Sequence, residues 1–324
     1  MYHFCTYFDS NYLLRGLTLY RSLRATGVSF RYYVLCLDQP CHDLLSTLAL
    51  PDLYPVQLAS VEAWDGDLIV AKANRSRIEY YFTLSPVFPL YVLEHWHEVE
   101  IITYLDADLY FYGSPAALFK ELSDQSVLII EHRFPDYLED KKKYGRFNVQ
   151  YESFRRDEQG LACLRGWRND CVAWCHDRLD GERYADQKYL DQWPRRYNRL
   201  VISQLKGAGL APWNWARYPL SFAHGQFTVD GEELIFYHFH GVKILHPCFI
   251  SHGLADFGIM PKKYRRPLYT GYIHALKDTA AWLAGKGIQP PSIKDRRIRG
   301  ASLIRMDTLL EILRKLWLQI MLVC

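Results

Sequence analysis

The chain has 324 residues, enough to bury a large hydrophobic core in one domain or in one domain with an extension. Hydrophobic residues make up 49% of it and charged residues 23%, as in ordinary globular proteins. The formal net charge of +3 is too small to indicate a nucleic-acid-binding protein, so we expect no nucleic acid among the partners.

Eight cysteines are scattered along the chain, and none forms a Cys-x-x-Cys pair. This pattern is typical of buried, reduced thiols and not of a zinc site, which favours a cytoplasmic location. The first residues lack the basic region and apolar core of a signal peptide. No uncharged apolar segment reaches the length of about 18 residues that indicates a membrane-spanning helix.

Predicted strands and helices alternate in the first hundred residues. Apolar runs predict strands at residues 2–7, 30–37 and 56–58, and apolar residues at helical spacing predict helices at 12–25, 41–48 and 72–93. Pro86 and Pro89 are expected to kink or divide the last helix. The alternation indicates a parallel α/β sheet, and such sheets bind ligands at the carboxyl ends of their strands.

Two aspartates follow the next predicted strand, an apolar run at residues 101–105. Because side chains alternate in extended chain, Asp106 and Asp108 point the same way and Ala107 points away. Adjacent carboxylates repel each other unless a positive group joins them. A hard divalent cation, Mn²⁺ or Mg²⁺, accepts such oxygen ligands and can also hold a diphosphate. A solvated turn is the alternative interpretation.

The remaining chain is predicted to contain helices at 115–122 and 160–177, strands at 126–131 and 233–240, a mobile charged loop at 136–145 and an aromatic loop at 207–215. Alternation along the second strand places His238 and His240 on one face. A further helix begins at Asp186 and Gln187. A linker at 285–292 precedes a basic segment at 294–299 and a helix at 308–323 that is apolar over most of its surface.

Five short motifs occur in a recognisable order: Phe-Asp-Ser-Asn-Tyr at 8–12, Asp-Ala-Asp at 106–108, Asp-Gln at 186–187, Pro-Trp-Asn at 212–214 and His-Phe-His-Gly-Val-Lys at 238–243. Over roughly residues 1–250 the chain resembles the retaining GT-A-fold glycosyltransferases related to glycogenin and to the bacterial lipopolysaccharide galactosyl- and glucosyltransferases (glycosyltransferase family eight). The resemblance implies the GT-A fold, a Rossmann-like mixed α/β sheet flanked by helices that binds a nucleoside diphosphate sugar.

The resemblance also implies roles for individual residues. The expected ligands of Mn²⁺ or Mg²⁺ are Asp106, Asp108 and His238. The residues expected to contact the donor nucleotide are Thr6, Tyr7, Asp9, Asn11, Lys72, Arg77, Asp106, Ala107 and Lys243. The family's phosphate-binding lysine usually lies one residue beyond the position of Lys243. The family's arginine before the two aspartates is absent here, so Lys72, Arg75 or Arg77 is expected to replace it.

For the sugar, the resemblance makes Asp186 and Gln187 the expected catalytic residues. The residues expected to contact the sugar or the acceptor are Asn148, Trp213, Asn214, His240 and Gly241. The chain has Asn148-Val149-Gln150 where the family has Asn-Ala-Gly, so the donor-sugar pocket is expected to differ in shape. Because Gln187 is a weak nucleophile, a front-face mechanism, in which the departing phosphate oxygen helps to deprotonate the acceptor, fits retention better than a covalent intermediate.

Several of these residues have a structural alternative. The alternative interpretation of His238 is a histidine of the hydrophobic core. The alternative interpretation of His240 is a side chain that only hydrogen-bonds a backbone group. Asp186 is equally suited to cap the helix that follows it, and Asp9 to stabilise a turn. The alternative interpretation of Trp213 is a residue that packs in the core or in a lid.

The predicted function is a metal-dependent transfer of a hexose, from UDP-hexose by preference, to a glycan or lipid-linked acceptor in surface polysaccharide or lipopolysaccharide synthesis. The alternatives are an inverting transferase with Asp186 as the base, and a non-catalytic module that binds a sugar nucleotide or a membrane. We expect a GT-A domain at 1–270 and, at 271–324, a helical, basic and apolar tail. The tail, with basic residues at 262–266, is predicted to bind the anionic inner face of the bacterial plasma membrane.

Overall fold

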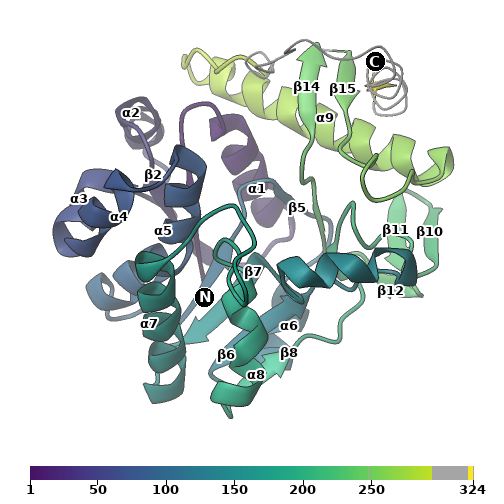
Figure 1. The fold of residues 1–324 in the computed structure, drawn as a ribbon. Coiled ribbons are helices and arrows are strands. Elements are labelled where there is room, and N and C mark those ends of the chain that lie inside the picture. Colours follow the sequence, from purple (N-terminus) through teal and green to yellow (C-terminus); the bar gives the residue numbers. More distant parts are fainter. Residues whose placement is uncertain (247, 294–319, 324) are drawn as a thin grey trace, which may run out of the picture.

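A seven-stranded sheet forms the centre of the computed structural model, which describes residues 1–246, 248–293 and 320–323 (Figure 1). Its order is β3-β2-β1-β4-β7-β6-β8. The strands are β1 (Tyr2–Phe8), β2 (Phe30–Cys36), β3 (Leu53–Gln57), β4 (Ile101–Leu105), β6 (Val127–Glu131), β7 (Phe147–Arg155) and β8 (Leu200–Ile202). The first four in sequence are parallel, as are β6 and β8, but β7 is antiparallel to both of its neighbours.

The sheet is therefore mixed, as the resemblance implied, and the purely parallel sheet expected from the strand–helix alternation is wrong at β7. The connection from β6 to β7 is the 3₁₀ helix η1 (Asp136–Tyr144), where a mobile loop was predicted. This short connection does not carry the chain back to the end of the sheet at which β6 begins, so β7 runs antiparallel to β6. Within η1, Lys142 Nζ lies 2.6 Å from Glu139 Oε2, an i,i+3 pair that suits this conformation.

Helices cover both faces of the sheet. On one face, α5 (Arg77–His95) and α7 (Glu158–Ala173) bury Phe88 and Trp167. On the other, α1 (Leu13–Ala25) buries Leu17 and Leu23 in a second cluster. The remaining helices before residue 200 are α2 (Gln39–Leu48), α3 (Leu58–Trp64), α4 (Asp67–Ala73), α6 (Ala116–Leu122), η2 (Lys188–Gln192) and α8 (Trp193–Arg196).

Helix α5 passes through Pro86 and Pro89 as one helix, so the prolines do not divide it, and the kink expected as the alternative stays a prediction. Each proline costs the helix a hydrogen bond, but both side chains are buried in a helix whose inner face is almost entirely apolar. A capping box between Ser76 and Glu79 also stabilises the amino end of the helix.

Three small sheets complete the described structure. They are β5 (Leu109–Phe111), β13 (Phe236–His238) and β9 (Ala208–Leu210); β10 (Leu220–Ala223), β11 (Gln226–Val229) and β12 (Glu232–Glu233); and β14 (Lys243–His246), β15 (Phe249–Ser251) and β16 (Ile320–Leu322). The helix predicted at 308–323 is wrong for residues 320–322, which pair as a strand with β15. Its other residues, apart from Val323, lie outside the described residues, as does the basic segment at 294–299.

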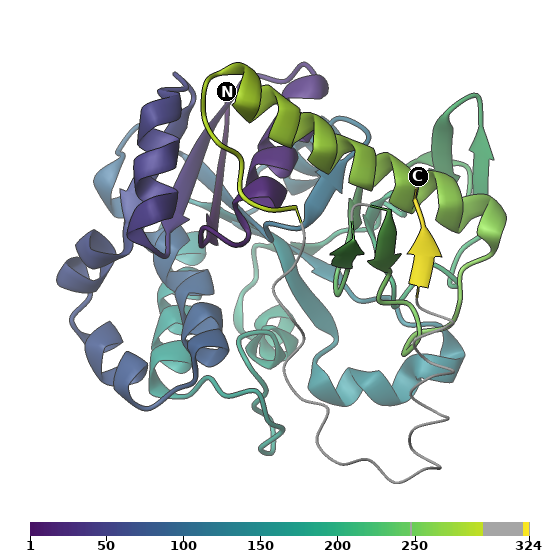
Figure 2. The ribbon, with the colours of Figure 1, turned by 90° about the horizontal axis from the view of Figure 1, so that it is seen from above.

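Helix α9 (Lys262–Gly285) crosses the boundary predicted at residue 270. It lies across α1, where the hydroxyls of Thr18 and Thr279 are 2.9 Å apart, and it lies beside the sheet of β14, β15 and β16 (Figure 2). The ring of Tyr272 stacks on Phe239 with centroids 3.8 Å apart. Residues 271–285 therefore belong to the folded body, and no helix among the described residues is long and apolar enough to cross a membrane.

Six of the seven described cysteines are free and buried, as predicted, and the seventh, Cys248, is in a disulfide bond.

Candidate active site

The two aspartates follow β4 at the carboxyl end of the strands of the main sheet, as predicted from the sequence. The backbone N–H of Asp106 donates to the carbonyl of Gln150 on β7, at 3.1 Å. Asp106 accepts in turn from Leu109 N at 3.2 Å, which closes the turn into β5. The Asp-Ala-Asp segment is thus held between two strands of different sheets. Ala107 is buried in this turn.

Strand pairing brings His238 to the aspartates. Strand β13 is antiparallel to β5 in a register that pairs His238 with Leu109, and Phe239 N donates to the Asp108 carbonyl at 3.0 Å. His238 Nε2 lies 3.0 Å from Asp108 Oδ1 and 3.7 Å from Asp106 Oδ2. The side chain of His238 is only 3% exposed, so its imidazole is not a surface group.

Charge and burial are balanced within this cluster. Burial raises the pKa of Asp106, and the charge of Asp108 adds to the increase, while His238 opposes it. Burial also acts on Asp108, but the positive imidazole of His238 outweighs it and holds the pKa of Asp108 below its usual range. Burial lowers the pKa of His238, but the carboxylate of Asp108 outweighs it and raises this pKa. The carboxylates therefore require a positive partner, which here is the imidazole.

The three side chains suit a divalent cation. Each offers one ligand atom, and these atoms lie within 4.8 Å of one another. Two carboxylate oxygens and one imidazole nitrogen form a donor set for a hard divalent cation that leaves positions for the oxygens of a ligand. The second nitrogen of the imidazole is already engaged, because Nδ1 lies 3.0 Å from Gln150 Oε1.

A cavity of about 330 Å³ opens beside the cluster. Six of the side chains predicted for the site, besides Asp106 and His238, line it: Tyr7, Asn148, Asp186, Gln187, Trp213 and His240. They come from β1, β7, the loop before η2, the loop after β9 and the end of β13. Residues far apart in the chain therefore meet in one hollow next to the candidate metal ligands.

A hydrogen-bonded chain leads through the wall of this cavity to Asp186. Tyr7 Oη lies 3.2 Å from Ser85 Oγ, which donates to Asp186 Oδ2 at 2.7 Å. Burial raises the pKa of Asp186 to about 7, although the Ser85 bond opposes the increase. The side chain does not cap η2, whose N-cap residue is Gln187, so the capping role considered for Asp186 is wrong.

The loop that carries Asp186 and Gln187 is held in a strained form. Ala185, which precedes Asp186, has φ of 46°, a left-handed conformation that costs a residue with a β-carbon on the order of 1 kcal/mol. Ala185 N donates to the His176 carbonyl at 3.0 Å. Gln187 Nε2 donates to the Tyr144 carbonyl at 2.9 Å, which fixes the amide at the cavity wall.

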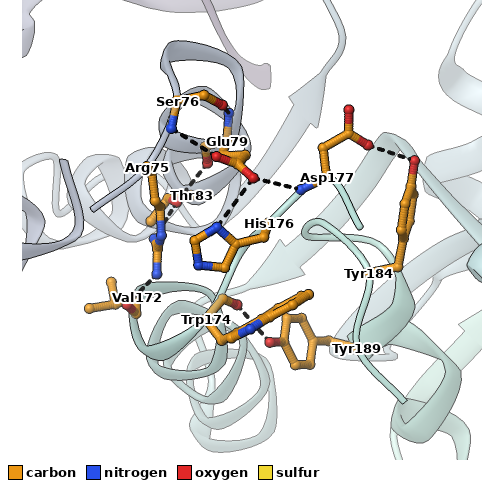
Figure 3. Close-up of polar contacts among 10 residues, drawn as sticks. All are labelled: Arg75, Ser76, Glu79, Thr83, Val172, Trp174, His176, Asp177, Tyr184 and Tyr189. Atoms are coloured by element: carbon orange, nitrogen blue, oxygen red, sulfur yellow. Dashed lines mark hydrogen bonds and ion pairs between the residues drawn. The ribbon is translucent and has the colours of Figure 1, made fainter. Parts of the chain in front are cut away.

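Glu79 anchors the start of this loop to α5 (Figure 3). Its Oε1 accepts from Asp177 N at 3.0 Å and pairs with His176 Nδ1 at 3.2 Å, and its Oε2 accepts from Ser76 N at 2.8 Å. Farther along the loop, Tyr184 donates to Asp177 Oδ1 at 2.8 Å. Burial raises the pKa of Glu79, but the bonds from Ser76, Asp177 and His176 outweigh it and lower this pKa to about 2.

We expect Glu79→Gln to lower the free energy of unfolding by about 2–3 kcal/mol at pH 7, because an amide NH₂ would replace one accepting oxygen opposite an N–H donor. The depressed pKa gives the carboxylate a stabilising effect that is complete above the pKa of the unfolded chain and is lost as the pH falls toward 2. Urea unfolding should therefore show the difference from wild type shrinking between pH 5 and pH 2. Glu94, on the same helix, is partly exposed and pairs with Arg165 at 3.3 Å at the protein surface, so the control Glu94→Gln should change stability by less than about 0.5 kcal/mol.

Two residues predicted for the nucleotide lie outside this cavity, in a second hollow of about 540 Å³. Asn11 and Arg77 line it together with Gln289, Pro290 and Pro291. The linker predicted at 285–292 thus lines a hollow on the domain instead of leaving it. Asp9 accepts from the backbone N–H groups of Asn11 and Tyr12 at 3.0 and 3.1 Å, so it has the turn role considered for it.

Other residues predicted for the site are held by protein groups or lie away from the cavity. Lys72 pairs with Glu62 at 2.7 Å, and neither lines the main cavity. The amide of Asn214 is engaged with Ala211 N, His132 O and Gly209 O, so it shapes a loop instead of meeting a ligand. Thr6 is fully buried, Gly241 adopts φ of 72° in a turn, and Lys243 is exposed on β14; none of them lines a described pocket.

Sequence reasoning missed several residues of the site. His132 and Phe134 follow β6 and stack at 4.7 Å in the cavity wall, beside Trp213. A polar residue at the carboxyl end of a predicted strand was the available signal for His132. Arg15, on α1, is buried and donates to the Val242 carbonyl at 3.1 Å, and its charge acts on Asp108.

Comparison with known proteins gives relatives and a fold, but no protein-family model matches the chain. The uncharacterized protein YfnD of Bacillus subtilis (strain 168) is 32% identical over 247 residues, which are 75% of this chain and 79% of YfnD. The uncharacterized protein YfnF of the same strain is 30% identical over 252 residues, 75% of this chain and 82% of YfnF.

Among solved structures, the galactosyltransferase LgtC in complex with donor and acceptor sugar analogs matches 82% of this chain and 99% of its own, with a TM-score of 0.51 and 15% sequence identity. This likeness, together with the mixed sheet, confirms the predicted GT-A fold.

Proposed function

Because the chain belongs to the family of YfnD and YfnF and has the GT-A fold, we propose that it is a metal-dependent glycosyltransferase that moves a hexose from a nucleoside diphosphate sugar to a glycan acceptor. The observation that carries the proposal is the cluster of Asp106, Asp108 and His238 beside a cavity that Asp186 and Gln187 also line. The LgtC structure contains donor and acceptor sugar analogs, which supports sugar ligands for this site.

Breaking the bond between a sugar and a diphosphate leaves negative charge on the leaving group, and a divalent cation at the cluster, when bound, supplies the charge that stabilises it. Asp106, Asp108 and His238 would hold that cation. Arg15 is a buried cation whose charge acts on Asp108, and we assign it the phosphate contact expected of Lys243, which is exposed on β14.

The cavity supplies the groups that a sugar requires. Asp186 and Gln187 are polar groups suited to ring hydroxyls and to positive charge that develops at the anomeric carbon. Trp213, with Phe134 and Phe257, gives the wall an aromatic surface that suits the apolar face of a sugar ring. These features support a hexose, and UDP is the nucleotide that we favour, in line with the resemblance to glycosyltransferase family eight.

We infer retention at the anomeric carbon. Gln187 is held by its amide nitrogen, and an amide oxygen is too weak a nucleophile for a covalent intermediate to be attractive. A front-face transfer, in which the leaving phosphate oxygen helps to deprotonate the acceptor, therefore fits a cavity wall formed by Gln187 better than a covalent intermediate does. The inverting alternative requires Asp186 as the base, and proton NMR of the product anomer separates the two.

The donor is identified by thermal stabilisation and hydrolysis assays with UDP-, GDP- and dTDP-hexoses, each with and without Mn²⁺. The proposal predicts that one nucleotide class stabilises the protein only with Mn²⁺ and that its sugar is released slowly. Metal-dependent nucleotide binding without hydrolysis or transfer would favour the non-catalytic module. The absence of any metal-dependent binding would overturn the proposal.

We further propose that the protein binds the inner face of the bacterial membrane as a peripheral protein that extends a surface glycan. At the start of α9, exposed Lys262, Lys263 and Arg266 line a shallow hollow with Phe222, which is 38% exposed. Basic residues around an exposed aromatic ring suit an anionic lipid surface. Replacing the three basic residues with glutamate should abolish cosedimentation with phosphatidylglycerol vesicles, and unchanged cosedimentation would exclude this surface.

A further inference from the structure

Gln150 contacts two of the three candidate metal ligands. It lies on β7 with no exposed surface. Its side-chain Oε1 is 3.0 Å from His238 Nδ1, and its backbone carbonyl accepts the N–H of Asp106 at 3.1 Å. One residue therefore holds the imidazole by its side chain and the first carboxylate by its backbone.

The chemistry of the imidazole gives this contact a consequence. A neutral histidine carries its proton on one ring nitrogen and can bind a cation only through the other. The carboxylates face Nε2, so the cation requires the proton on Nδ1. An amide oxygen opposite Nδ1 accepts that proton, whereas an amide NH₂ in its place would move the proton to Nε2 and block the ligand atom.

The surroundings of Gln150 keep its side chain in place. Gly209 on β9 adopts φ of 85°, and a β-carbon at this position would lie 2.8 Å from Gln150 Nε2 and 3.1 Å from Ile130 Cγ2. The glycine therefore leaves the space that the amide fills between β7 and β9. These walls fix where the amide lies. Its Nε2 has no hydrogen-bond partner among the described residues, so the contact with His238 Nδ1 is the one that orients the amide.

We propose that Gln150 is a positioning residue that selects the Nδ1–H form of His238 and so presents Nε2 to the divalent cation. This inference rests on the proposed function, since it assumes that the cluster binds a cation. The resemblance places a glycine at this position in the related glycosyltransferases, so the contact depends on a side chain that this protein has in its place.

The test compares Gln150→Met, which removes the accepting oxygen at similar volume, with Gln150→Glu, which keeps one. Gln226→Met, at the exposed first position of strand β11, is the matched control. Circular dichroism first establishes that each variant is folded. Free Mn²⁺ is then counted by electron paramagnetic resonance during a titration of the metal-free protein, and the ring nitrogens of His238 are assigned by long-range ¹H–¹⁵N correlation.

We expect Gln150→Met to bind Mn²⁺ about 10- to 100-fold more weakly than wild type, and Gln150→Glu and Gln226→Met to bind it within about threefold of wild type. In the metal-free wild type, His238 Nδ1 should carry a proton that Gln150 Oε1 accepts, and the Nε2 proton next to Asp108 is the one that the cation displaces. If Gln150→Met does not fold, the ¹⁵N spectrum of the wild type and the Mn²⁺ affinity of Gln150→Glu decide.

Unchanged Mn²⁺ affinity in Gln150→Met, or a His238 ring without a proton on Nδ1 in the wild type, would overturn the inference and leave the proposed function standing. A wild-type protein that binds no Mn²⁺, or binds it equally well without Asp108, would overturn both.

Discussion

Replacing Asp108 with alanine is expected to abolish Mn²⁺-dependent binding of the nucleotide and to reduce turnover by on the order of 1,000-fold or more. Asp108 Oδ1 lies 3.0 Å from His238 Nε2, so the substitution removes the carboxylate next to the imidazole as well as one expected metal ligand. Isothermal titration calorimetry with UDP, in the presence and absence of Mn²⁺, measures the binding.

The matched control is Asp278→Ala, which removes an exposed carboxylate from α9 and should leave both quantities unchanged. Because Asp108 lies in a turn whose backbone bonds do not involve its carboxylate, we expect the variant to keep its circular dichroism spectrum. Retained turnover in folded Asp108→Ala would refute the assigned site.

Asp186→Asn is expected to reduce turnover by about 10²- to 10⁴-fold and, at the same time, to stabilise the protein at neutral and alkaline pH. The amide has the shape of the carboxyl group, and its oxygen still accepts from Ser85, so the cavity wall is preserved. What the substitution removes is a negative charge in a buried position. Nucleotide binding with Mn²⁺ should change little, because Asp186 is placed at the sugar and not at the diphosphate.

The pH dependence of that stabilisation follows from the pKa of Asp186, which burial raises from 3.8 to about 7. Between these values the unfolded chain has lost the proton that the folded protein keeps, so wild-type stability falls as the pH rises through this range. The asparagine variant lacks this loss. We expect it to be more stable than wild type by on the order of 2–4 kcal/mol above pH 7, and similar to wild type near pH 3.5.

Urea unfolding at pH 3.5, 5.5 and 8 measures this difference, and the exposed Asp180→Asn is the control. Equal stability of Asp186→Asn and wild type at pH 8 would show that the carboxyl group carries no buried charge. Full turnover in the variant would remove Asp186 from the catalytic residues.

The parts of the fold that depend on local sequence could be predicted. Strands β1, β2 and β4 are apolar runs, and the carboxylates of Asp106 and Asp108 stand where β4 ends, because strand ends in α/β sheets are where polar groups collect. The direction of β7 could not be read in this way, since it depends on the path of the connection through η1.

The position of His238 depends on pairing between β5 and β13, which are more than 100 residues apart, and no local pattern gives that register. The resemblance to known glycosyltransferases supplied it. The same resemblance placed Asn214 in the binding site, where the structure shows that its hydrogen-bonding atoms hold a loop. The burial and the hydrogen bonds of the side chain distinguish His238 from Asn214, and a sequence motif shows neither of them.

The most direct test of the account is a crystal structure of the protein with Mn²⁺ and UDP, with data collected at a wavelength that gives manganese an anomalous signal. The account predicts one anomalous peak within about 2.0–2.3 Å of oxygens of Asp106 and Asp108, His238 Nε2 and the diphosphate. A diphosphate bound without a peak at these three side chains, or a peak elsewhere in the protein, would contradict it.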